Sequence, residues 1–149
     1  MKTFTVNGFS ASVIQDNEMA LKFGIPSIIP SCFIDKINGD VVIITTSGFN
    51  VLSDKTQQVI LTHELGHLAL GHLEITPAEI MTNNDLLEAE ADRWAMEIVG
   101  VDALDKAVYE TAAVTLDQLA INGVELTPAI RSEMREVSNK RISNRTSVY

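Results

Sequence analysis

The sequence contains little sulfur and no long apolar segment. Cys32 is the only cysteine among 149 residues, which excludes an internal disulfide and favours a reducing, cytoplasmic setting. No run of about 18 apolar residues occurs, so we expect no membrane span. The opening segment, MKTFTVNGFS, lacks the continuous apolar stretch of a secretion signal. Together with an apolar content of 46%, these absences predict a soluble globular domain.

Basic residues are also scarce. The chain has 11 Lys and Arg against 20 Asp and Glu, a formal net charge of −9 at pH 7. Because nucleic-acid-binding domains usually present a basic face, we expect no direct nucleic-acid binding. Five of the basic residues fall within residues 131–149. We expect this stretch to be a solvated helix end that runs into a frayed terminus, with docking on the acidic body or on a partner as the alternative.

The order of the elements indicates the fold class. The length predicts one domain over residues 1–149. Its strand-rich part, to about residue 52, contains TFTVNGFSAS and SCFIDKINGDVVIITT, which each place Asn-Gly between β-prone residues, as hairpins do. Residues 53–140 are expected to be helical, and residues 141–149 to form a basic tail. This order predicts an α+β domain, with an N-terminal antiparallel sheet followed by a helical half.

Local signals divide the helical half. Ser53 or Asp54 is a suitable N-cap for its first helix, and Gly71 is a suitable residue to end it. From such signals we expect strands at about 32–36 and 41–46, helices at about 16–23, 54–70, 85–99 and 102–120, a short helix opening at Pro77 and a last helix opening at Pro128.

All three histidines lie in the segment ILTHELGHLALGH, residues 60–72. His63, Glu64 and His67 form the motif H-E-x-x-H. Residues four apart on a helix differ by about 40° in direction, so both imidazoles project from one face and can bind one ion. Glu64 then lies beside the ion, where it can hold a water molecule. Gly66, at the middle of a helix that is apolar on nearly all sides, predicts the close approach of another segment. A buried histidine pair without a metal is the alternative.

A hydrolytic zinc site needs a third protein ligand and one open position. On a continuing helix His72 would face away from His63, so we expect it to be a polar residue just past the helix end or a residue at the rim of the site. Glu88, in LEAEADRWA, is the better candidate because small alanines beside it would let two helices approach closely. We therefore expect zinc to be bound by His63, His67 and Glu88.

Asp92 follows Glu88 by four residues and shares its helix face. This position suits a carboxylate that accepts the second ring N–H of a zinc-bound histidine. Glu90 points to the other side of that helix and cannot serve the same ion.

The two motifs together resemble those of the ImmA/IrrE family of metallopeptidases. QQVILTHELGHLALGH is similar to the family's active-site helix, and EAEADRWA is similar to its second motif, E-x-x-A-[D/N]-x-[F/W]-A. The resemblance covers a modest part of the chain, and the following MEIVGVD departs from the ELLMP-like residues common in the family. The resemblance implies a small zincin-like domain and a protein substrate such as a transcriptional repressor.

These expectations combine into a zinc-dependent endopeptidase. Glu64 would take a proton from the water that zinc activates and pass it to the leaving amine. An edge strand, within residues 41–46, would align an extended peptide by β-augmentation. His72 or Tyr109 would supply a further donor to the oxyanion.

Two alternatives accompany this interpretation. Cys32 is expected to be a small buried residue at the start of a strand, and the alternative is a thiolate that blocks the open zinc position. The alternative function is that of a non-catalytic zinc protein that binds a partner without cutting it.

Overall fold

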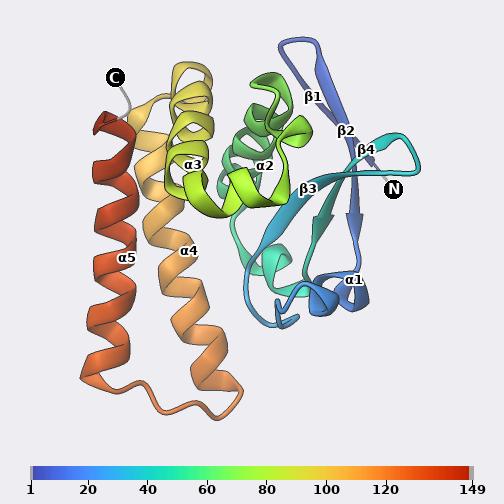
Figure 1. Cartoon of the computed structure of the whole chain (residues 1–149). Helices are drawn as coiled ribbons and strands as arrows, with labels where there is room; N and C mark the ends of the chain where they lie inside the picture. The colour runs from blue at the N-terminus through green and yellow to red at the C-terminus, as the bar shows by residue number, and fades with distance from the viewer. Residues whose placement is uncertain (1, 148–149) are drawn as a thin grey trace.

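The computed structural model describes residues 2–147, with side chains as far as residue 145. It is an α+β structure, as predicted, in which the sheet lies on one side and the long helices on the other (Figure 1). The HExxH helix runs between these two halves, so the histidines sit at the centre of the molecule. No helix among the described residues combines the length and the apolar character that a membrane crossing requires.

Both predicted hairpins form, and both turn through Asn-Gly. Asn7 and Gly8 have φ values of 51° and 83°, and Asn38 and Gly39 have values of 52° and 85°. Positive φ at both central residues is the signature of the type I′ turn, which matches the twist of the flanking strands. The strands are β1 (Lys2–Val6), β2 (Phe9–Gln15), β3 (Cys32–Ile37) and β4 (Asp40–Thr45).

The sheet is mixed, so the prediction of an antiparallel sheet is wrong at its centre. The strand order is β1-β2-β4-β3, and β2 pairs with β4 in parallel, with Ser12 opposite Val42. Between the hairpins, α1 (Asn17–Lys22) and residues 23–31 carry the chain to the far edge, from which β3 enters the sheet. Residues 42–45 of β4 are buried whichever face they point to, which is why β4 takes the central position and β3 the edge.

The predicted HExxH helix is α2 (Asp54–Ala69). Its N-cap is Ser53, whose hydroxyl accepts a hydrogen bond from the backbone N–H of Thr56 at 3.3 Å. Leu65 is fully buried in the cluster that joins α2 to the sheet, where it is accompanied by Ile43. Two short 3-10 turns, η1 (Ser47–Val51) and η2 (His72–Glu74), flank α2.

The next helix, α3 (Pro77–Val99), joins two segments that we expected to be separate helices. They are continuous across a kink at Asn83, where φ is −117° and ψ is 19°. The packing of α3 against α2 confirms the close approach predicted at Gly66. A Cβ atom at Gly66 would lie 3.2 Å from both the Ala91 carbonyl oxygen and the Trp94 ring.

The last two helices, α4 (Val101–Ile121) and α5 (Pro128–Ser147), run side by side (Figure 1). The prediction of a solvated, frayed end from residue 141 is wrong for the described residues, because α5 continues to Ser147 and Arg145 is only 2% exposed. A buried carboxylate on α3 and a partly exposed one on α4 hold this end in place, so the alternative of docking on the acidic body describes it better. Residues 148–149 of the predicted tail lie outside the described part.

Candidate metal centre

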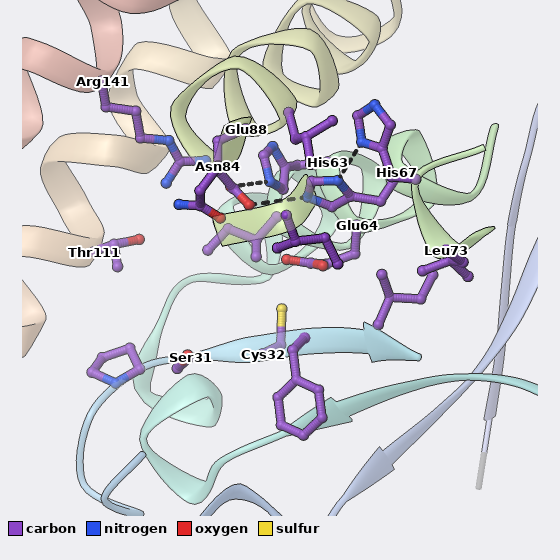
Figure 2. Close-up of a pocket in the computed structure, with 17 residues that line it drawn as sticks. Ser31, Cys32, His63, Glu64, His67, Leu73, Asn84, Glu88, Thr111 and Arg141 are labelled. Carbon is purple, nitrogen blue, oxygen red and sulfur yellow. Dashed lines mark hydrogen bonds and ion pairs between the residues drawn. The ribbon is translucent and has the colours of Figure 1, made fainter. Parts of the chain in front are cut away.

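Two turns of α2 and one turn of α3 bring together the three predicted ligands. His63 and His67 are 3% and 9% exposed and point toward Glu88, which is partly exposed (Figure 2). His63 Nε2 lies 3.0 Å from one oxygen of Glu88, and His67 Nε2 lies 3.3 Å from the other. One ligand atom from each residue lies within 4.8 Å of the other two, which is close enough for all three to hold a single ion.

The spacing of these atoms suits zinc. Zinc takes nitrogen and oxygen ligands at about 2.0–2.1 Å in a tetrahedron, whose corners are then about 3.4 Å apart. The two rings contact different oxygens of Glu88, at 3.0 and 3.3 Å, and each contact is close to that separation. Three protein ligands of this kind leave one tetrahedral position for water or substrate, as in hydrolytic zinc sites. The donor set therefore fits a zinc ion.

Asp92 lies behind His63. Its Oδ1 is 2.6 Å from His63 Nδ1, and its side chain is fully buried. When Nδ1–H donates to Asp92, the lone pair of the ring is on Nε2, which is the nitrogen that faces Glu88. The structure thus places Asp92 in the outer contact that the sequence led us to expect.

A second outer contact, not expected from the sequence, involves His72. Gly71 adopts the left-handed conformation, with φ of 76°, and turns the chain back beyond the end of α2. His72 is therefore buried against His67 instead of facing away, and the two Nδ1 atoms lie 2.8 Å apart. Its Nε2 lies 3.5 Å from Glu90. His72 thus lies just past the helix end and lines the cleft, as the sequence led us to expect, but it does not face away from the ligands, because the helix ends before it.

Hydrogen bonds set the protonation of these groups when no metal is bound. Burial by itself lowers the pKa of His63, but the hydrogen bonds to Asp92 and Glu88 outweigh burial and raise the pKa to about 10. Burial raises the pKa of both carboxyls, but other contacts outweigh it. Hydrogen bonds with His63 and His67 hold the pKa of Glu88 below its usual range, and hydrogen bonds with His63 and Arg141 do the same for Asp92. The pair of His63 and Glu88 is thus an ion pair that a metal ion can replace, with loss of a proton.

Glu64 lies in the cleft beside the histidines and is 9% exposed (Figure 2). Burial raises the pKa of this carboxyl, and the neighbouring His63 and His67 oppose that rise. A general base works best when its pKa approaches the working pH, so the direction of this shift favours proton transfer.

The cleft has a volume of about 350 Å³ and reaches beyond the ligands to β3, η2 and α5. Cys32, at the start of β3, points toward Glu64 across it (Figure 2). Burial and the Glu64 carboxylate raise the pKa of this thiol. Cys32 does begin a strand, as expected, but its side chain is only partly buried and lines the cleft.

Tyr109 does not share this cleft. Half of its surface is exposed, and its hydroxyl lies 3.4 Å from Asn139 on α5. The cleft is instead lined by Asn84, Thr111 and Arg141, none of which was expected there. Asn84 precedes Glu88 by four residues, a helical spacing that could have identified it. Thr111 and Arg141 come from α4 and α5, and no local pattern relates those helices to the motif.

Comparison of the chain with protein-family models, with curated proteins and with solved structures finds no match.

Proposed function

We propose that the protein is a zinc-dependent endopeptidase. The proposal is carried by one observation. Glu64 is not one of the three candidate ligands, yet it lines the same cleft as His63, His67 and Glu88. A structural zinc site is usually closed by four ligands and is rich in thiolates. Here the single cysteine cannot supply that closure, and a buried carboxylate beside the ligands suits catalysis.

Each residue has a distinct part in the proposed reaction. A zinc ion held by His63, His67 and Glu88 would supply Lewis acidity, which polarises the scissile carbonyl and lowers the pKa of a water molecule. Glu64 accepts the proton of that water and delivers it to the leaving amine. Asp92 keeps His63 in the tautomer that leaves Nε2 free for the ion.

The edge strand β3 is the element best placed to align a substrate. The expectation that an edge strand lies within residues 41–46 was wrong, because those residues belong to the central strand β4. Among the described strands β1 and β3 form the two edges, and of these β3 lies at the cleft, which residues 30–34 line. An extended peptide added to β3 would pass the ligands with its backbone hydrogen-bonded. The resemblance to the ImmA/IrrE family favours a regulatory protein, such as a transcriptional repressor, as the source of that peptide.

Glu64→Gln tests the proposal because it removes the base while preserving the size of the side chain. The zinc-loaded protein is incubated with an extract of its own cells, with and without a chelator, and new peptide N-termini are identified by mass spectrometry. We expect chelator-sensitive cleavage by the wild type and by the exposed control Glu97→Gln. We expect Glu64→Gln to bind zinc with unchanged stoichiometry and to lose at least 100-fold in rate, within the usual contribution of a general base.

Two outcomes would contradict the proposal. Cleavage by Glu64→Gln at the wild-type rate would exclude the proposed base. Zinc binding by the wild type without any new N-terminus would instead favour the non-catalytic protein that binds a partner.

A further inference from the structure

Asp92 is a charged group with no access to water. Its side chain is 0% exposed, and burial of an unpaired carboxylate is strongly unfavourable. One hydrogen bond from His63 cannot satisfy two carboxylate oxygens. The remaining donors must therefore come from elsewhere in the molecule.

They come from the last helix. Arg141 Nε donates to Asp92 Oδ2 at 3.0 Å, and Arg141 Nη2 donates to Oδ1 at 2.9 Å. Two parallel N–H···O bonds of this kind fix the plane of a carboxylate as well as its position. Oδ1 is the same oxygen that His63 Nδ1 contacts at 2.6 Å. The orientation of the Asp92 carboxylate, and with it that of the His63 ring, therefore depends on Arg141.

Arg145, one helical turn further along α5, strengthens this attachment. It is 2% exposed, and its Nη1 donates to Asp105 on α4. Its Nη2 lies 3.7 Å from Asp92 Oδ2. Charged contacts thus join α5 to both neighbouring helices at the level of the metal ligands.

We propose that Arg141 is a positioning residue of the metal centre: by holding Asp92 it holds His63, so the centre is complete only when α5 is docked. The inference rests on the metal-binding part of the proposed function and does not require peptide hydrolysis. Without Arg141, the buried carboxylate is free to rotate or to take a proton, and His63 loses a fixed acceptor.

Zinc affinity of Arg141→Met is the test. Affinity is measured by competition with a chromophoric chelator, on protein whose folding is checked by circular dichroism. Loss of an outer contact of a metal ligand typically costs roughly 10–100-fold in metal affinity. Arg141 acts through such a contact, the one between Asp92 and His63, so we expect a loss of up to that size. Arg141→Lys keeps the charge but not the paired donors, so it should bind zinc more weakly than wild type and more tightly than Arg141→Met. Arg135→Met, on the exposed face of α5, should bind as wild type does.

A double-variant comparison separates positioning from a general structural role. In an Asp92→Asn background the carboxylate that Arg141 holds is already gone, so Arg141→Met should cause no further loss of affinity. An equal loss in both backgrounds would overturn the inference. Wild-type zinc affinity in both Arg141→Met and Arg141→Lys would also overturn the inference. If Arg141→Met does not fold, the zinc affinity of Arg141→Lys alone decides. Failure of the wild type to bind zinc would overturn the metal site itself, whereas zinc binding without hydrolysis would overturn only the peptidase.

Discussion

In the proposed centre, His63 is the residue at which metal and proton compete. In the absence of a metal its pKa is raised to about 10, so the ring is positively charged at neutral pH and lies between two carboxylates. A zinc ion binds only the ring that has lost a proton. The carboxylates of Glu88 and Asp92 therefore have two opposed effects. Their negative charge attracts a cation, and it also stabilises the proton on His63 that the cation must displace.

Zinc affinity should consequently rise with pH. Below a pKa of about 10, each unit of pH increases the fraction of deprotonated His63 about tenfold, so we expect the apparent affinity to rise about tenfold per unit between pH 7 and 9. Competition titrations in zinc-buffered solutions measure this slope. Asp92→Asn removes a hydrogen bond that raises the pKa of His63, so its slope should be shallower. An affinity for the wild type that does not change with pH would show that His63 is neutral before zinc binds.

At the scale of elements, the contact of α2 with α3 determines the spacing of the ligands. Gly66 on α2 lies against Ala91, which follows Glu88 by one helical turn. A Cβ atom at Gly66 requires Ala91 and Trp94 on α3 to move by a few tenths of an ångström, and a larger side chain requires more, so we expect Glu88 to shift with that helix. The glycine is thus a packing requirement of the site.

Gly66→Val should therefore disturb stability and metal binding together. Overpacking of this kind costs roughly 1–3 kcal/mol, and the displacement of Glu88 from both rings should lower zinc affinity at least tenfold. Urea unfolding and chelator competition measure the two effects. Gln58→Val, at an exposed position of the same helix, reports the cost of a β-branched residue alone and should leave zinc affinity unchanged. Equal zinc affinity in the two variants would contradict the role given to this contact.

Local patterns were sufficient to predict most elements but not how they assemble. The features that were predicted correctly each depend on only a few neighbouring residues. They are the Asn-Gly turns, the Ser53 cap, and the helical spacings of His63 with His67 and of Glu88 with Asp92. The parallel pairing of β2 with β4 depends on the path between the hairpins, for which residues 23–31 carry no periodic signal. The buried contact of His72 with His67 was not predicted for a related reason: the left-handed Gly71 turns the chain back, whereas the geometry of a continuing helix would direct His72 away.

At the scale of the whole molecule, the candidate centre draws on almost every layer. Its candidate ligands come from α2 and α3, their outer contacts from α3 and η2, the arginine that holds Asp92 from α5, and one wall of its cleft from the edge strand β3. Arg141 is 49 residues from Asp92 in the chain, and no sequence pattern relates the two. The sequence could predict the cluster of His63, His67 and Glu88, because these residues lie in two short motifs, but it could not predict the long-range contacts that hold them.

A centre assembled from so many elements should stabilise the entire fold when it binds its ion. Zinc at about 100 times its dissociation constant adds about 2.7 kcal/mol to the free energy of unfolding, provided that the unfolded chain does not bind it. For a domain of this size that corresponds to a rise of roughly 5–11 °C in Tm. Differential scanning calorimetry should show one transition that moves to higher temperature with zinc and returns with a chelator. Glu88→Ala lacks one of the three ligands and should show little shift, while Glu97→Gln, exposed on the same helix, should shift as wild type does. A second, zinc-insensitive transition would mean that α5 or the sheet unfolds independently of the centre, and that the coupling through Asp92 and Arg141 does not extend to the whole molecule.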